Sequence, residues 1–290
     1  MKTPDKYTFI GAVRPFTFPV ALITCSIGLL LAWQQGQFNA LQALLVLAGG
    51  VLLQAGVNLI NDYSDLPLLR RYPDSQWKVR AVRRHFRLGM LCFLLASAIA
   101  LYFVSLRGLS FLLLCLLGLA GALGYTLKPV NLKSRGLGVV LVFWLMGVLM
   151  IGGSAVALGA VLTPALILQT VPVSLLVSLL LLSNELRDFE ADSQHGHTTL
   201  TVRAGYRFSV RLYLVLLALS YLLSALLLAL GLLPGALWLL LSLPLVFGPV
   251  RLLNARPQQR TALTPATARL LLGFGVLFCV ALIDPLPPLF

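Results

Sequence analysis

The chain has 290 residues, of which 59% are hydrophobic and only 11% charged. Soluble domains average roughly 45–50% apolar and about 25% charged residues. One globule of this size cannot bury so much apolar surface, which excludes a soluble enzyme, a disordered protein and a disulfide-stapled secreted domain. A helical protein embedded in a membrane is the class that remains.

Nine apolar runs are long enough to cross a bilayer core of about 30 Å as helices. They cover residues 17–34, 40–60, 88–106, 109–126, 137–158, 163–183, 209–230, 234–250 and 268–286. The runs are continuously apolar rather than alternating, which excludes strands with an edge open to lipid. The spacers are short, so we predict an all-α integral membrane protein with a single transmembrane domain over residues 1–290.

The basic residues orient these runs. The chain carries 22 Lys and Arg against 9 Asp and Glu. With the N-terminus in the cytoplasm, Arg107 is the one basic residue that falls on the opposite side. Cytoplasmic loops are enriched in Lys and Arg, so we predict a cytoplasmic (inner) membrane protein with its N-terminus inside and its C-terminus outside. Positive charge in short loops between spans also argues against a nucleic-acid partner.

Most of the acids gather in two clusters, at the cytoplasmic ends of the second and sixth runs. The polar residues of these clusters are Asn58, Asn61, Asp62 and Asp65 in the first, and Asn184, Glu185, Arg187, Asp188, Glu190 and Asp192 in the second. Residues four apart share one face of a helix, and this spacing separates Asn61 from Asp65, Asn184 from Asp188, and Asp188 from Asp192. Glu185 and Glu190 lie off that face, and we expect them to be solvated.

Stacked oxygen ligands of this kind suit a hard divalent cation. Mg²⁺ takes carboxylate, amide and water oxygens and commonly completes its shell from substrate phosphates. Cations that would complement a diphosphate stand at the same depth, namely Lys128, Lys133, Arg135 and Arg187. The alternative is that the acids only solvate basic loops. Carboxylates at membrane depth are costly, and two clusters with matched spacing favour a functional site.

These residues resemble the UbiA superfamily of membrane prenyltransferases, in which N-D-x-x-D-x-x-x-D follows span two and D-x-x-x-D follows span six. The second motif continues into Gly196-His197-Thr198-Thr199-Leu200, similar to the menaquinone branch that prenylates 1,4-dihydroxy-2-naphthoate. The stretches that begin at Arg14-Pro15 and Tyr125-Thr126 agree with the same branch. Two positions depart from the pattern, because Leu69 replaces the last Asp of the first motif and His197 replaces a Lys.

The resemblance implies helices around a central cavity and transfer of a polyprenyl group from its diphosphate to an aromatic acceptor, through an allylic carbocation. It implies Mg²⁺ bound by Asp62, Asp65, Asp188 and Asp192 with help from Asn61. It implies that Lys128 and Arg187 neutralise the leaving diphosphate. We expect the substrates to contact Asn58, Asn61, Asn184, Tyr63, Tyr125, Arg14 and His197. The expected partners are a prenyl diphosphate, an aromatic small molecule and membrane lipid.

Other functions stay open at this point. The incomplete first motif leaves room for a terpene cyclase of the same superfamily, in which the cation closes on its own chain. A non-catalytic relative that binds or transports lipid is the alternative from another class. The basic loop at 70–87 is expected to cover the site as a lid or to contact anionic lipid head groups.

Overall fold

The computed structural model describes residues 7–69, 75–126, 129–194 and 196–283, without the side chains of Phe16, Ser64, Asp65, Leu68 and Thr126. Every regular element in this part of the chain is helical, which confirms the all-α prediction. The long helices are α2 (Phe18–Gln34), α3 (Ala40–Asn61), α5 (Gln76–Arg107), α6 (Leu109–Thr126), α9 (Pro164–Gln194), α11 (Tyr206–Ala229), α12 (Leu243–Leu253) and α13 (Leu263–Ile283).

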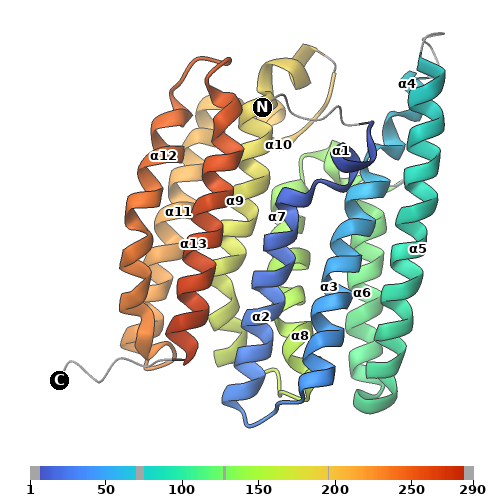
Figure 1. Cartoon of the computed structure of the whole chain (residues 1–290). Helices are drawn as coiled ribbons and strands as arrows, with labels where there is room; N and C mark the ends of the chain where they lie inside the picture. Colours follow the sequence, from blue (N-terminus) through green and yellow to red (C-terminus); the bar gives the residue numbers. More distant parts are fainter. Residues whose placement is uncertain (1–6, 70–74, 127–128, 195, 284–290) are drawn as a thin grey trace.

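Shorter elements join the long helices. They are α1 (Phe9–Val13), η1 (Pro15–Thr17), η2 (Asp62–Asp65), α4 (Leu66–Leu69), η4 (Leu132–Arg135), α7 (Gly138–Val142), the π-helical η5 (Phe143–Leu149), α8 (Met150–Leu158), α10 (Leu200–Ala204), η6 (Pro234–Ser242) and η7 (Arg260–Ala262). In Figure 1 the long helices run side by side as a bundle, with α1, α4 and α10 at one end. The chain enters α2 at that end, and α13 finishes at the opposite end.

Close packing at glycines brings neighbouring helices of the bundle together. α3 packs along α5, α2 along α8, and α9 along both α11 and α13. A Cβ at Gly28 would overlap the carbonyl oxygen of Ile151, and one at Gly89 would come within 2.7 Å of Ile60 Cγ2. Small residues let helix backbones approach in a membrane, where van der Waals packing replaces the hydrophobic effect between helices. Substitution of either glycine would push α8 or α5 away from its neighbour.

Eight of the described helical segments are long and apolar enough to cross a membrane, and a further apolar helix, Leu109–Tyr125, is shorter. Each of the nine coincides with one of the predicted apolar runs. Large apolar side chains face outward along them, such as Leu94 at 66% and Phe247 at 77% exposed. Such surfaces are compatible with lipid rather than water. The prediction of many apolar spanning helices is confirmed, and the count of nine stays a prediction.

The sequence-based boundaries are wrong at two places next to the site. Residues 76–87 were expected in a basic loop, but they form the first turns of α5. Val82 and His85 are buried while Arg80 and Arg84 are exposed, so this stretch is an amphipathic helix that extends past the apolar run. The expected span at 163–183 also continues, because no Pro or Gly stands between residue 183 and Gly196, whose φ of 72° suits glycine. The second acid cluster therefore lies on continuous helix, as its spacing predicted.

The first acid cluster has a different backbone from the one expected. α3 ends at Asn61, and Asp62–Asp65 form the 3-10 turn η2 before α4 begins. A 3-10 helix has about three residues per turn, so Asp62 and Asp65 occupy equivalent positions and Asn61 and Asp65 do not. Leu69, at the position of the missing third Asp, is buried beside Leu66 and Val82. It completes a small apolar cluster.

Candidate functional site

A cavity of about 1120 Å³ lies among α3, α5, α6, α8 and α9. Its wall includes Leu45 near the start of α3 and Asp62 just past the end of that helix. The cavity therefore follows most of α3, about 25 Å at ~1.5 Å rise per residue. Polar side chains from both acid clusters form one end, and mostly apolar side chains form the rest. This volume slightly exceeds the roughly 300–1,000 Å³ that small-molecule sites occupy.

Asp62 is the central acid of the first cluster. Its side chain is 8% exposed, and its Oδ1 atom accepts a hydrogen bond from Arg14 Nη2 at 3.1 Å. The other carboxylate oxygen, Oδ2, is buried and accepts no hydrogen bond from the described residues. A buried carboxylate oxygen without a partner is expensive, so this atom is suited to a cation supplied from outside the chain.

Lys133 brings a cation to the same end of the cavity. It lies in η4, between α6 and α7, and its Nζ atom donates to Asn61 Oδ1 at 3.1 Å. Lys133 and Asn61 both line the cavity, as do Asn58 and Arg14. The interaction joins the connection between α6 and α7 to the end of α3. Lys133 is among the cations that the sequence predicts to complement a diphosphate, and its contact with Asn61 becomes visible only in the fold.

The second cluster lines the same cavity from α9. Asn184, Arg187, Asp188 and Asp192 all border it. Arg187 pairs with its neighbour Asp188 through two hydrogen bonds, Nε to Oδ1 at 2.8 Å and Nη2 to Oδ2 at 2.5 Å. In each cluster, an arginine thus forms an ion pair with one aspartate. Such charge-assisted pairs keep the acids neutralised in the membrane and provide guanidinium groups suited to a phosphate.

The expectation of a solvated Glu185 is wrong. Its side chain is buried and borders the cavity, and its Oε2 atom accepts from the backbone N–H of Thr201 at 2.9 Å. The carboxylate ties α9 to the start of α10 because that N–H lies in the first turn of the short helix, where no intrahelical acceptor exists. Glu190 lies outside the cavity wall and forms an ion pair with Arg260.

The remaining predicted site residues divide into three groups. Tyr125 and His197 line the cavity. Tyr63 does not line it, since its side chain is 37% exposed and its ring packs on Phe86 at 4.1 Å between centroids. The Asp65 side chain and the whole of Lys128 lie outside the described residues.

A divalent cation fits this donor set when a substrate supplies part of its shell. The described residues contain no group of three or more His, Cys, Asp or Glu side chains arranged to hold an ion by themselves. Mg²⁺ commonly takes only one or two carboxylates and draws its other ligands from water and phosphate oxygens. The unpartnered Oδ2 of Asp62 and the carboxylates of Asp188 and Asp192 on the same cavity provide oxygen donors of that kind.

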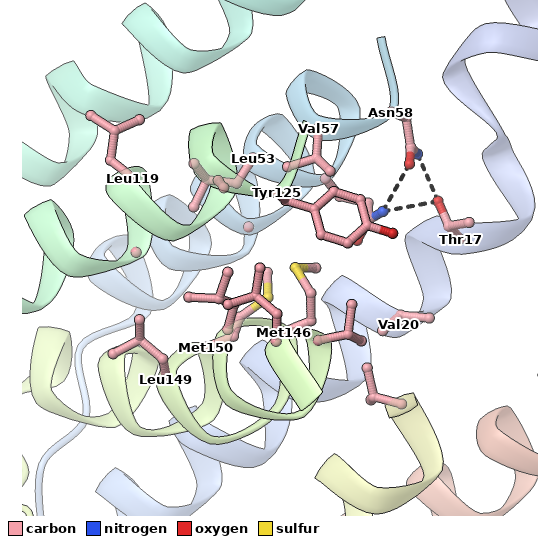
Figure 2. Close-up of a pocket in the computed structure, with 18 of the residues that line it drawn as sticks. Thr17, Val20, Leu53, Val57, Asn58, Leu119, Tyr125, Met146, Leu149 and Met150 are labelled. Atoms are coloured by element: carbon pink, nitrogen blue, oxygen red, sulfur yellow. Dashed lines mark hydrogen bonds between the residues drawn. The ribbon is translucent and has the colours of Figure 1, made fainter. Parts of the chain in front are cut away.

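Below the acid clusters the cavity is bounded by apolar side chains. Figure 2 shows Leu119, Met146, Leu149 and Met150 on this part of the wall. Gly153 also borders it, and a Cβ there would meet no atom within 4 Å. An apolar chamber that continues from a charged end suits an amphiphile with an anionic head and a long hydrocarbon tail.

Sequence analysis missed a hydrogen-bonded group on the wall of α3. The dashed triangle in Figure 2 joins Thr17, Asn58 and the amide of Gln54, a buried residue that also borders the cavity. Gln54 stands four residues before Asn58 and seven before Asn61, so one face of α3 carries all three. A glutamine within an otherwise apolar run is the signal that could have identified it.

Comparison with known proteins identifies the family. Residues 21–274 match the model of the UbiA prenyltransferase family. Over 213 residues the chain is 33% identical to 1,4-dihydroxy-2-naphthoate octaprenyltransferase of Escherichia coli (strain K12), which covers 68% of each chain. It is 31% identical over 291 residues to UbiA prenyltransferase domain-containing protein 1 of Xenopus tropicalis, covering 95% of this chain and 82% of that relative.

Solved structures share the fold. A UbiA homologue from Archaeoglobus fulgidus, bound to GPP and Mg²⁺, matches with a TM-score of 0.64 and 16% identity over 94% of this chain and 99% of that chain. The apo structure of a UbiA homologue from Aeropyrum pernix K1 matches with a TM-score of 0.65 and 21% identity, over 92% and 96% of the two chains. At these identities the likeness concerns the fold alone. On the family match and the curated relatives, the chain belongs to the UbiA prenyltransferase family and is an integral membrane prenyltransferase.

Proposed function

We propose that this enzyme transfers a polyprenyl group from its diphosphate to an aromatic acceptor of the 1,4-dihydroxy-2-naphthoate type, in a reaction that depends on Mg²⁺. The observation that carries the proposal is the shared cavity. Asn61 and Asp62 at the end of α3 and Asp188 and Asp192 on α9 border one end of it, and the rest is mostly apolar. The name of the Escherichia coli relative supports the choice of acceptor.

The charged end is the proposed diphosphate site. Asp62, Asp188 and Asp192, with Asn61, would hold Mg²⁺ there, and Asp65 belongs to the same predicted set. When bound, the metal supplies a Lewis acid for the diphosphate oxygens. The GPP and Mg²⁺ named for the Archaeoglobus fulgidus homologue support this assignment.

Cationic side chains of this chain would stabilise the leaving group. Arg14, Lys133 and Arg187 border the cavity, and each already contacts an oxygen of a cluster residue, on Asp62, Asn61 and Asp188 respectively. The three side chains could then donate to the oxygens of a diphosphate bound between them, and the helices would not have to move. Preorganised cations of this kind favour the state in which negative charge grows on the leaving group. The role of Lys128 stays a prediction of the same type.

In the proposed reaction the bond between the allylic carbon and the bridging oxygen breaks, and its electron pair leaves with the diphosphate. The ring of the acceptor then supplies the electron pair for the new carbon–carbon bond. Loss of a proton or of carbon dioxide from the ring restores its aromaticity. The chain contributes by excluding water from the cation and by placing the Tyr125 ring on the cavity wall, where its face can stabilise positive charge.

The apolar chamber is the proposed site of the prenyl tail. It follows α3 toward the opposite end of the bundle, so a tail anchored at the charged end can extend along the membrane normal. Asn58, Asn184, Tyr125 and His197, which also border the cavity, are proposed to contact the substrates. We place the enzyme in the cytoplasmic membrane with its N-terminus inside, as the basic residues predict.

The test uses purified protein in detergent or nanodiscs with Mg²⁺, prenyl diphosphates of several lengths, and 1,4-dihydroxy-2-naphthoate. Prenylated naphthoate identified by mass spectrometry is the expected product. A cyclic hydrocarbon released without any acceptor would replace this proposal with a terpene cyclase. Absence of diphosphate release with every substrate would instead favour the non-catalytic relative that binds lipid.

A further inference from the structure

Gln54 is a polar residue in the middle of an apolar helix, outside both acid clusters. It is 7% exposed and borders the cavity. It stands seven residues before Asn61 on α3, about 10 Å deeper at ~1.5 Å per residue. Polar groups at membrane depth are costly and commonly functional, which raises the question of what this one binds.

A chain of hydrogen bonds fixes which atom of the Gln54 amide faces Thr17 and Asn58. The carbonyl oxygen of Val13 can only accept, and it takes a hydrogen from Asn58 Nδ2 at 2.7 Å. The Asn58 Oδ1 atom is therefore turned to Gln54, whose Nε2 donates to it at 3.2 Å. A backbone carbonyl thus determines the orientation of both amides.

Thr17 completes the arrangement. Its hydroxyl donates to the Arg14 carbonyl oxygen at 2.9 Å, so its oxygen is left to accept. It accepts from Asn58 Nδ2 at 2.8 Å and from Gln54 Nε2 at 3.2 Å. Both hydrogens on Asn58 Nδ2 and both on Gln54 Nε2 are then donated in hydrogen bonds. The Gln54 carbonyl oxygen must face away from this pair of residues.

The Gln54 Oε1 atom has no partner of its own. It is buried and accepts no hydrogen bond from the described residues. An unsatisfied buried acceptor costs far more than a satisfied one, so the working enzyme is expected to supply a donor. A diphosphate oxygen does not fit, because it is itself a hydrogen-bond acceptor, and the prenyl tail has no polar hydrogen to donate. A hydroxyl on the aromatic acceptor is the substrate group that fits.

We propose that the Gln54 carbonyl oxygen accepts a hydrogen bond from a ring hydroxyl of the aromatic acceptor and thereby selects hydroxylated acceptors. This inference rests on the proposed function and adds the residue that recognises the hydroxyl group of the acceptor. A site built to bond a hydroxyl discriminates strongly against an analogue without one, because its own buried group is then left unpaired.

The experiment compares the wild-type enzyme with Gln54→Met, which keeps the length of the side chain and removes the carbonyl. The acceptors are 1,4-dihydroxy-2-naphthoate and its two mono-O-methyl ethers. In the wild type, methylation of the hydroxyl that Gln54 binds is expected to lower kcat/KM by about tenfold. The preference is this ratio of kcat/KM between the free and the methylated acceptor, and Gln54→Met should reduce it below about twofold. Methylation changes the reactivity of the ring equally in both enzymes, so the ratio between them isolates the contact.

Two further variants separate binding from structure. Gln169→Met removes another buried glutamine, whose Nε2 bonds the Leu232 carbonyl oxygen away from the cavity, and it should keep the wild-type preference. Thr17→Val leaves the Gln54 carbonyl in place but removes one of the two acceptors that orient its amide. It should lose part of the preference, which gives a second test if Gln54→Met fails to fold.

The outcomes distinguish this inference from the proposed function. A wild-type enzyme that prenylates no aromatic acceptor removes both. An active wild type combined with an undiminished preference in Gln54→Met overturns the Gln54 assignment and leaves prenyl transfer intact. An equal rise of KM for the prenyl diphosphate and for the acceptor in Gln54→Met would also overturn it, because a contact with the acceptor should leave the diphosphate KM within about twofold.

Discussion

Arg14 Nη2 lies 3.1 Å from Asp62 Oδ1, which joins the segment before α2 to the 3-10 turn after α3. Arg14 is held with φ at 51°, in the left-handed region that residues with a Cβ rarely adopt. Strain of this kind costs about 1–2 kcal/mol and persists where the surroundings require it. The pairing turns the guanidinium and the carboxylate toward the end of one cavity.

Asp62→Asn should reduce turnover by about 100-fold or more, because it removes the charge from an oxygen proposed to hold Mg²⁺ at the leaving group. Asp188→Asn should behave in the same way. Both proteins should still insert and fold, which circular dichroism and size-exclusion chromatography can show. Glu190→Gln is the matched control, since Glu190 lies outside the cavity wall, and it should keep near-wild-type turnover. Full activity in both aspartate variants would refute the metal assignment.

Removal of divalent metal should stop prenyl transfer reversibly. Excess chelator is expected to abolish product formation, and Mg²⁺ should restore it, because Asp62 Oδ2 has no partner among the described residues and the proposed metal takes the rest of its shell from phosphate and water. Diphosphate release measured across a Mg²⁺ titration provides the readout. Undiminished release in chelator would show that Arg14, Lys133 and Arg187 suffice without metal.

Lys133→Gln should raise KM for the prenyl diphosphate by about tenfold, because it replaces a cation at the charged end with a neutral amide. KM for the aromatic acceptor should change little. Arg135→Gln removes a charge from the same short element, but Arg135 bonds the Pro129 carbonyl oxygen and is not part of the cavity wall. If both variants change the diphosphate KM equally, the contact of Lys133 with Asn61 has no special role.

Gly153→Phe should shorten the prenyl chain that the enzyme accepts. A side chain at this position enters open space in the apolar chamber, because even a Cβ there meets no neighbour within 4 Å. Long prenyl diphosphates should lose at least about tenfold in kcat/KM, whereas a short one should keep most of its rate. Leu117→Phe places the same phenylalanine side chain on an exposed face of α6 outside the cavity, and it should not change the chain-length profile. Equal losses for short and long substrates would place the tail elsewhere.

The two ends of the chain should lie on opposite sides of the membrane. α2 begins at one end of the bundle and α13 finishes at the other, and the basic residues place the first of these ends in the cytoplasm. Reporter enzymes active on only one side of the membrane, fused to each terminus, can measure this. Both termini on the cytoplasmic side would refute the odd number of crossings and with it the count of nine.

The sequence alone determined the membrane class, the helical spans and the two acid clusters. Each follows from local composition or from spacing along one helix, because about 20 apolar residues specify a span and a four-residue interval specifies a face. The match of Asn184, Asp188 and Asp192 to one face of α9 is of this kind. The basic start of α5 has the composition of a loop, because its charges obscure the helical spacing of the buried residues Val82 and His85.

Only the tertiary structure decided which residues meet. Lys133 reaches Asn61 from 72 positions away in the chain, and Arg14 reaches Asp62 from 48 positions away. Glu185, which the sequence pattern predicted to be solvated, is instead buried and bonded to α10, because the fold brings the backbone N–H of Thr201 to its carboxylate. The orientation of the Gln54 amide likewise depends on Val13 and Thr17, on a separate segment. Contacts between distant segments depend on helix packing, and no local pattern in the sequence encodes that.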